Sequence, residues 1–321
     1  MRRALLTVAV VAGVVLLPAP AFAHGGDTPD ATSFRTEVTG LAPAVPGLVV
    51  TAIEAGARLE LTNDTGRTVE VLGYSGEPYL EVRPDGTYEN VHSPATYLNQ
   101  TLAGETPLPA AADPAAPPQW RRVSGDLTVR WHDQRTHWTG DGLPPAATAE
   151  PYRGHHLRDW VVPLRQETTE LRIQGTLDYL PPPPEWLWWA GAVAIMLAVA
   201  AAGRWSVAAG PVAGAALLAY AILRTLDAPA PTVTYAAGLI GLASAFLTRS
   251  AFLTTLAGAV VAVFGGLIDL GVLQQAVVPV AGPAWIARTA VTLAIGGGLG
   301  LVVQGMMRLR HQPGATAKVA G

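Results

Sequence analysis

The feature that most constrains this chain is a succession of apolar segments after residue 185. At about 1.5 Å per residue, a helix needs about 20 residues to cross the ~30 Å hydrocarbon core. The shorter segments therefore span it only if their helices extend a few residues beyond the apolar run. They predict an all-α bundle of five transmembrane helices, and with it a multi-pass protein of the cell membrane in contact with the lipid bilayer. The five segments are Trp186–Ala202, Val207–Leu223, Val233–Leu247, Phe252–Leu270 and Trp285–Met307.

Basic residues set the expected orientation of this bundle. If the first helix enters from outside, Arg204, Arg249 and the tail 308–321 lie inside, which obeys the positive-inside rule. Trp186 and Trp285, at the starts of the first and fifth segments, then mark the outer interface. The amino-terminal half is expected outside the cytoplasm and the carboxyl terminus inside it.

One acid, Asp269, lies inside an expected crossing. Arg288 lies near the same outer face, so the sequence predicts an ion pair between the two. Because acids inside a membrane often mark ion pathways, a small transporter built on the five helices is one alternative function. Glycines four residues apart, Gly210 and Gly214, indicate close packing between helices instead.

The start of the chain has the three parts of a secretory signal peptide. Met1-Arg2-Arg3 is basic, Ala4–Leu17 is apolar and Ala21-Phe22-Ala23 is a small-x-small cleavage signal. The apolar run is too short to span a bilayer, which favours cleavage over an uncleaved anchor. Cleavage after Ala23 would make His24 the first residue, with a free α-amino group beside its imidazole.

Charge divides the rest of the chain into two halves. Residues 24–185 hold 22 acids and 12 arginines, whereas residues 186–321 hold 2 acids and 7 bases. An acidic half argues against nucleic acid as a partner and is compatible with cations. The chain has no cysteine, which excludes disulfides, thiolate metal sites and a cysteine nucleophile.

Alternation of apolar and polar residues in the acidic half predicts about eight short strands. Turn residues at Asn63–Gly66 and Pro84–Gly86 are typical of hairpin connections. With no long amphipathic helix between them, the strands favour an all-β antiparallel sandwich of immunoglobulin-like type. The predicted organisation is a signal peptide over 1–23, the exported sandwich over 24–180, a proline-rich spacer over 181–185, the helical bundle over 186–307 and a cytoplasmic tail over 308–321.

The segment from Trp131 to Trp138 concentrates the polar chemistry of the exported half. It reads Trp131-His132-Asp133-Gln134-Arg135-Thr136-His137-Trp138. In a strand, successive side chains alternate between faces, so the two histidines meet at one ion only if the strand breaks. A structural interpretation is an Asp133–Arg135 pair and hydrogen-bonded histidines that tie a loop to the sandwich, with the tryptophans in the core.

A metal interpretation starts from His24. An amino-terminal histidine chelates copper through its α-amine and ring nitrogen, and His132, His137 and Asp133 are the candidates for the remaining ligands. The alternative is that His24 is simply the residue after the cleavage site, in a disordered tail. A second group, His155-His156 near Asp159, is a further candidate or a solvated turn.

Two motifs carry a resemblance. With Trp131–Trp138 and Ser93–Asn99, the exported half resembles a group of exported actinobacterial membrane proteins that share a Trp-His-Asp-x-Arg-x-His-Trp motif. Members of that group often have a second histidine at the position of Gln134. A mature His24 ahead of a β-sandwich is also loosely similar to periplasmic copper-resistance carrier proteins, which implies copper binding by analogy.

Nothing in the sequence marks a catalytic nucleophile or a phosphate-binding glycine loop. We therefore expect a non-enzymatic, membrane-anchored binding protein of the cell envelope that binds copper through His24 or binds a partner protein. The alternatives are a structural or interaction module without metal, and the small transporter.

Overall fold

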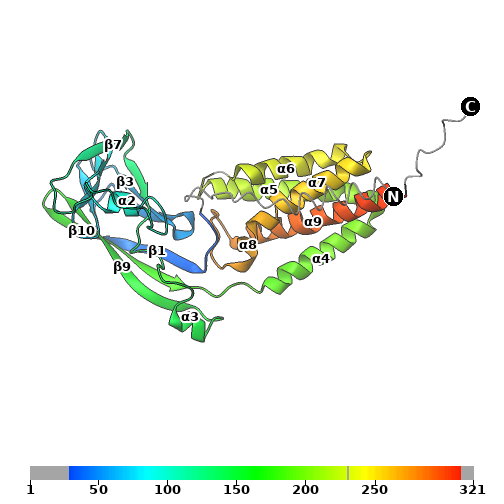
Figure 1. The fold of residues 1–321 in the computed structure, drawn as a ribbon, viewed down its shortest axis with the longest axis horizontal. Coiled ribbons are helices and arrows are strands. Elements are labelled where there is room, and N and C mark those ends of the chain that lie inside the picture. The colour runs from blue at the N-terminus through cyan, green and yellow to red at the C-terminus, as the bar shows by residue number, and fades with distance from the viewer. Residues whose placement is uncertain (1–28, 230, 312–321) are drawn as a thin grey trace, which may run out of the picture. The chain divides into compact units, whose positions relative to one another are not determined.

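The chain folds into two units of different secondary structure. The computed structural model describes residues 29–229 and 231–311 and divides the chain between Pro182 and Pro183. The first unit is built from antiparallel strands and the second from apolar helices (Figure 1). The predicted order, a β-rich part followed by helices, is confirmed. The signal peptide and His24 lie outside the described residues.

The described part of the β unit contains a seven-stranded and a three-stranded sheet. The larger sheet has the order β1-β10-β9-β4-β5-β6-β7 and the smaller one β2-β3-β8, and every strand pairs antiparallel to its neighbours. The strands are β1 (Phe34–Ala42), β2 (Leu48–Ile53), β3 (Arg58–Asn63), β4 (Val69–Leu72), β5 (Pro78–Arg83), β6 (Gly86–Asn90), β7 (Trp120–Ser124), β8 (Thr128–Trp131), β9 (His155–Gln166) and β10 (Thr169–Tyr179).

Both sheets contribute to one hydrophobic core. Leu59 and Leu61 of the small sheet and Val162 and Ile173 of the large one belong to a single buried cluster, and all four are inaccessible to solvent. Their burial follows the alternation of apolar residues along each strand. The finer expectation of an immunoglobulin-like topology stays a prediction.

One of the two expected hairpins is confirmed and the other is wrong. Pro84 and Asp85 form the tight turn between β5 and β6, with Arg83 paired to Gly86. Asn63–Gly66 instead leads the chain from the small sheet to the large one, since β3 pairs with β2 and β8 while β4 pairs with β5 and β9. The buried Asn63 amide donates to the Val82 carbonyl at 2.8 Å, which bridges the two sheets at this crossing.

Apolar helices occupy all five predicted segments of the second unit. Three are long and apolar enough to cross a membrane: Trp205–Thr225, Ala251–Asp269 and Ala284–Arg310. Glu185–Ala201 and Thr232–Phe246 are shorter, so the expectation of five crossings stays a prediction. The α-helices of this unit are α4 (Glu185–Ala201), α5 (Ala209–Thr225), α6 (Thr232–Ala243), α7 (Ala251–Phe264), α8 (Gly271–Gln274) and α9 (Ala284–Arg310), and its 3-10 turns are η2 (Gly203–Ala208), η3 (Ser244–Phe246) and η4 (Leu267–Asp269).

Glycines let helix α9 approach two neighbours at backbone distance. A Cβ atom on Gly298 would lie 2.6 Å from the Gly258 carbonyl oxygen of α7, and one on Gly296 would lie 2.5 Å from the Ala192 carbonyl oxygen of α4. Such contacts are the usual way in which helices associate in lipid.

Candidate functional site

The strand that enters the Trp131–Trp138 segment ends at its first residue. β8 stops at Trp131, and the Thr136 amide donates to the Asp133 carbonyl at 2.9 Å, which closes a turn over residues 133–136. The two-face alternation expected of a continuous strand therefore does not apply beyond Trp131. The side chain of Trp131 is buried in the core, and Trp138 packs at its margin with its ring stacked on Phe34.

Asp133 is the centre of this segment. Its carboxylate is fully buried and accepts four hydrogen bonds. Arg135 donates from Nε at 2.8 Å and Nη2 at 2.7 Å to the two oxygens, and its backbone amide donates at 3.1 Å. Trp131 Nε1 donates the fourth bond at 3.1 Å. The structure therefore contains the Asp133–Arg135 pair of the structural interpretation, in the bidentate geometry that gives the strongest arginine–carboxylate contacts.

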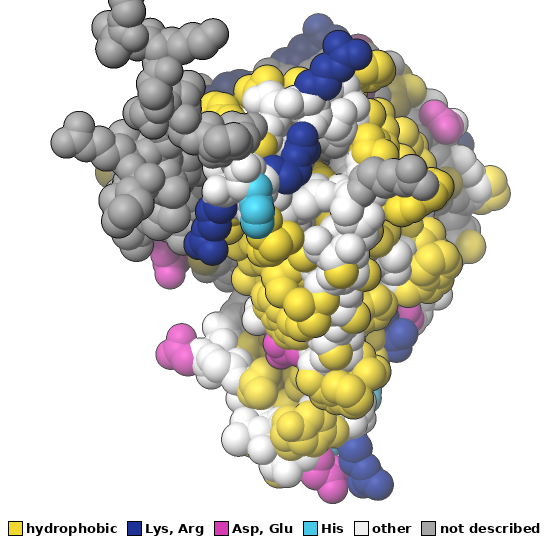
Figure 2. Space-filling view, turned by 90° about the vertical axis from the view of Figure 1, so that its right-hand side faces the viewer, with side chains coloured by type: hydrophobic (Ala, Val, Ile, Leu, Met, Phe, Trp, Pro, Cys, Tyr) yellow, Lys and Arg dark blue, Asp and Glu magenta, His cyan; other side chains and the backbone are white. Residues whose placement is uncertain are grey.

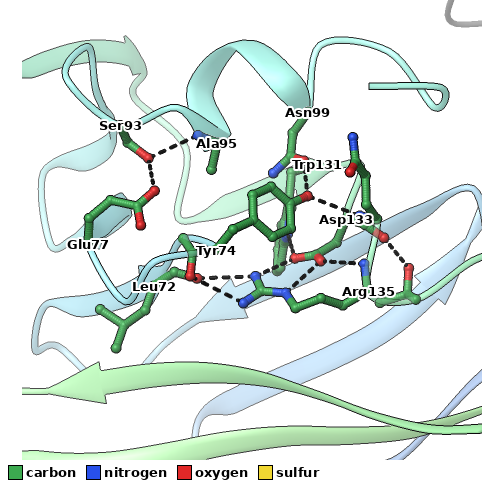
Figure 3. Close-up of polar contacts among 12 residues, drawn as sticks. Leu72, Tyr74, Glu77, Ser93, Ala95, Asn99, Trp131, Asp133 and Arg135 are labelled. Atoms are coloured by element: carbon green, nitrogen blue, oxygen red, sulfur yellow. Dashed lines mark hydrogen bonds and ion pairs between the residues drawn. The ribbon is translucent and has the colours of Figure 1, made fainter. Parts of the chain in front are cut away.

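Arg135 ties this segment to the end of strand β4 (Figure 3). Its Nη2 donates to the Leu72 carbonyl at 3.1 Å, and its guanidinium lies 5.0 Å from the centre of the Tyr74 ring. The carboxylate of Asp133 and the β4 carbonyl thus share one cation, which fixes the loop to the large sheet.

Tyr74 joins the two motifs that the sequence singled out. Its hydroxyl donates to the side-chain oxygen of Asn99, at the end of the Ser93–Asn99 segment that contains helix α2 (Ala95–Leu98). The same hydroxyl accepts from the Gln134 backbone amide at 3.0 Å. Burial, and then the charge of Asp133, raise the pKa of Tyr74 above its ordinary value, so the phenol stays protonated and remains a donor. Figure 3 shows Tyr74 between the two segments.

His132 uses both of its ring nitrogens inside the β unit. Nδ1 lies 2.7 Å from the Ala57 carbonyl and therefore carries the proton, while Nε2 accepts from Arg58 Nε at 3.2 Å. The side chain is buried. A metal ion at either nitrogen would have to replace one of these bonds.

His137 faces a different part of the protein. Its Nε2 lies 2.9 Å from the Leu102 carbonyl, and its buried Nδ1 has no hydrogen-bond partner among the described residues. Burial lowers the pKa of His137 and outweighs the opposing effect of the Leu102 bond, so the ring is neutral at pH 7. His132 and His137 thus have separate partners and are not brought to one point by the structure.

The other histidine group lies at the exposed start of β9 and is bonded there. His155 stacks on Tyr179, with ring centres 6.1 Å apart. His156 lies between two carboxylates, with Nδ1 2.9 Å from Asp178 and Nε2 3.3 Å from Asp159. Across residues 29–229 and 231–311, no group of three or more histidine or carboxylate side chains is placed to hold a metal ion.

The predicted ion pair of Asp269 with Arg288 is wrong. Asp269 pairs with Arg224 of α5 at 3.1 Å, and Arg224 also donates to the Tyr220 hydroxyl at 3.2 Å. Arg288, in the second turn of α9, donates instead to the carbonyls of Val272 in α8 and of Gln275 and Ala276 just after it. Arg224 and Asp269 meet because α5 and the α7–η4 segment finish at the same end of the unit. The sequence alone does not show which helix ends are neighbours.

Tyr74 and Glu77 are the members of this polar network that sequence reasoning missed. Glu77 is buried, accepts from the Ser93 hydroxyl at 2.7 Å and from the Ser75 amide at 2.9 Å, and so fixes the start of the Ser93–Asn99 segment. Both residues lie in a turn between strands, where a polar side chain gives no periodic signal. The one available hint was the unexplained polarity of the segment around Ser93.

Most polar groups of this network are bonded within the protein, and the buried Asn99 Nδ2 and His137 Nδ1 atoms are the exceptions. Asp133, Arg135 and His132 are bonded to protein groups, and no nucleophile lies beside a free base in the described network. In the comparisons with known proteins, no family model, curated protein or solved structure matches this chain.

Proposed function

We propose that this chain is a non-enzymatic, membrane-anchored protein whose β unit is an extracytoplasmic interaction module of the cell envelope, working without a metal ion. The observation that carries the proposal is the internal use of the Trp131–Trp138 segment. Both nitrogens of His132 and both oxygens of Asp133 are bonded within the unit, so the segment stabilises the scaffold and a partner binds elsewhere. The signal-peptide pattern supports the external location.

A groove between two sheet edges supports the binding role. Strand β7 ends the large sheet and β8 ends the small one, and a cavity of about 410 Å³ lies between them. Edge strands present unpaired backbone groups, to which an extended segment of a partner adds as a further strand. The groove is lined by Thr87, Val123, Ser124, Asp126, Thr128 and Arg130.

Site-specific cross-linking tests this proposal. A photoreactive amino acid replaces Val123, which is 48% exposed on β7, in the full chain in its native membrane. The matched control replaces Val161, which is 44% exposed but lies on β9 inside the large sheet. We expect a discrete protein adduct from position 123 and none from position 161. Equal cross-linking from both positions, or none from position 123, contradicts the proposal.

Copper binding at His24 is the second candidate function. The supporting observation is the buried Nδ1 of His137, which has no hydrogen-bond partner among the described residues, so a metal ion bound there replaces no hydrogen bond. Calorimetric titration with Cu(II) compares the mature protein beginning at His24 with a version extended by one residue before His24. Equal affinities for the two forms contradict this function.

The small transporter is the third candidate, supported by the Arg224–Asp269 pair and the Tyr220 hydroxyl inside the helical unit. Proton uptake into proteoliposomes, followed with a pH-sensitive dye, tests it. If Asp269→Asn leaves uptake unchanged, the pair is a structural contact and this function is excluded.

We also propose that all five apolar helices cross the bilayer, with the loop at Asp227 outside and the loop at Ser250 inside. The chain has no cysteine, so a single introduced cysteine gives an unambiguous label. In intact cells, an impermeant maleimide is expected to label Asp227→Cys and to leave Ser250→Cys unlabelled until the membrane is opened. Labelling of both sites in intact cells contradicts this topology.

A further inference from the structure

A cavity of about 730 Å³ opens at the end of the helical unit where α4 and α9 terminate. Its walls come from the end of α4, the turns η2 and η3, the start of α7 and the last turns of α9. The lining divides into an apolar wall, with Ala200, Val207 and Leu301, and a polar side, with Ser206, Gln304 and Arg308. None of the pocket-lining residues is acidic.

A buried glutamine builds the polar side. Gln304 lies in the longest apolar helix, where an amide is costly unless it is bonded. Its Oε1 accepts from the Ser206 hydroxyl at 2.5 Å, and its Nε2 donates to the Gly203 carbonyl. These bonds join α9 to the corner between α4 and α5, so the cavity has a fixed wall.

One arginine stands at the mouth of the cavity. Arg308 is exposed and donates from Nη2 to the Thr248 carbonyl at 2.8 Å, which uses one of its five N–H donors and orients the guanidinium. His311 also lines the mouth, but its Nδ1 lies 2.7 Å from the Met307 carbonyl and is therefore the donor, which leaves Nε2 as an acceptor. Figure 2 faces this end of the unit and shows basic and histidine side chains beside a hydrophobic surface.

Charge and shape together select the ligand. A guanidinium without an acid among the lining residues favours an anion, and its N–H donors suit a phosphate. A free phosphate would leave the apolar wall unused, whereas a phospholipid places acyl chain along it and its headgroup at the mouth. Basic pockets between membrane helices bind anionic headgroups in this way.

We propose that this cavity binds an anionic phospholipid, with its phosphate held by Arg308 and its acyl chain against Val207 and Leu301. The lipid bridges the ends of α4 and α9 and the start of α7. By the positive-inside bias of the sequence, this is the cytoplasmic end of the bundle. The proposal is independent of what the β unit binds.

Native mass spectrometry of the full chain tests the proposal by counting retained lipids. The protein is released from nanodiscs that contain phosphatidylglycerol and phosphatidylcholine in equal amounts. We expect one phosphatidylglycerol to be retained in preference, and Arg308→Gln to lower its retention about fivefold, as for one basic contact to an anionic lipid. Arg310→Gln is the matched control, because it removes the same charge from the same helix at an exposed residue outside the cavity lining. Arg308→Lys keeps the charge and is expected to restore most of the retention, which separates lipid binding from misfolding.

Three results would overturn the proposal. Equal losses with Arg308→Gln and Arg310→Gln would mean that the lipid follows general surface charge. Equal retention of the two lipids by the unmodified chain would mean that the headgroup charge is not recognised. Full displacement of phosphatidylglycerol by millimolar inorganic phosphate would assign the cavity to the free anion.

Discussion

Leucine, valine and aromatic side chains fill the core of the β unit, whereas the closest contacts between helices are made by glycine. Leu59, Leu164 and Tyr179 are among the biggest inaccessible side chains of the sheets. Between α7 and α9, the backbones at Gly258 and Gly298 come so near that neither residue has room for a methyl group. In water, burial of apolar area stabilises a fold, but in lipid that force is absent between helices and close approach replaces it.

Removal of the Asp133 charge is expected to have the largest effect, because side-chain contacts stabilise the β unit. Asp133→Asn breaks the bidentate pair and leaves Arg135 with an uncompensated charge, which costs about 3–5 kcal/mol of stability. Hydrogen exchange of peptides from the β unit measures the free energy of opening in the full chain.

The matched control for this prediction is Asp159→Asn. Asp159 is also paired, with His156 at 3.3 Å, but its side chain is 81% exposed, so we expect almost no change. If Asp133→Asn opens the β unit no more easily than Asp159→Asn does, the polar network is not what fixes the loop.

The helical unit is tested by adding a methyl group instead of removing a charge. Gly298→Ala places a Cβ 2.6 Å from the Gly258 carbonyl oxygen and 2.7 Å from the Ala262 amide nitrogen, so α7 and α9 must separate, at a cost of about 1–3 kcal/mol. Gly297→Ala is the control one residue away. Its Cβ would lie 3.6 Å from its nearest neighbours, an ordinary contact, and alanine favours a helix over glycine by about 1 kcal/mol. Unfolding of the purified chain in mixed micelles, followed by far-ultraviolet circular dichroism, should show that Gly297→Ala is more stable than Gly298→Ala. The reverse order of stability would refute close backbone packing.

A smaller effect is expected where the two sequence motifs meet. Tyr74→Phe removes the hydroxyl that links Asn99 to the Gln134 amide, which leaves buried polar groups unbonded and costs about 1–2 kcal/mol. Faster hydrogen exchange is expected in both segments, Ser93–Asn99 and Trp131–Trp138. Tyr88→Phe, which removes an exposed hydroxyl bonded to Asp85, should leave both unchanged. Faster exchange in one segment alone would mean that Tyr74 does not couple them.

The sequence predicted what depends on local periodicity and missed what depends on distant partners. The alternation of apolar and polar residues located β2, β3 and β4 but not β7 (Trp120–Ser124). Strand β7 is an exposed edge strand, and because it has no buried face its sequence does not alternate. Asp133 and Arg135 are two residues apart in the sequence, so their ion pair could be inferred from the local sequence. The partners of Arg135 at Leu72 and of Asp269 at Arg224 are set by the topology, which one sequence does not reveal.

The smallest expected effect is a dependence of stability on pH, which we expect in the β unit and not in the helical unit. Burial lowers the pKa of His137 in the folded β unit, so the unfolded chain binds a proton more readily than the folded one does. This contribution to stability is present above the ordinary histidine pKa of about 6.5 and is lost as the pH falls through that value toward the lower pKa of the folded state.

The charged and titratable groups around the His137 ring are Asp133, His132 and Arg158, and the charge of Arg158 adds to the lowering of its pKa. His137→Gln keeps a donor toward the Leu102 carbonyl without a titrating ring. The opening free energy of this variant should therefore change less between about pH 7.5 and about pH 5.5, the range in which histidine titrates. Hydrogen exchange of the β unit in both proteins measures the difference, with peptides from α7 and α9 as the internal reference; an identical pH dependence in the two proteins would mean that His137 is not a source of acid sensitivity.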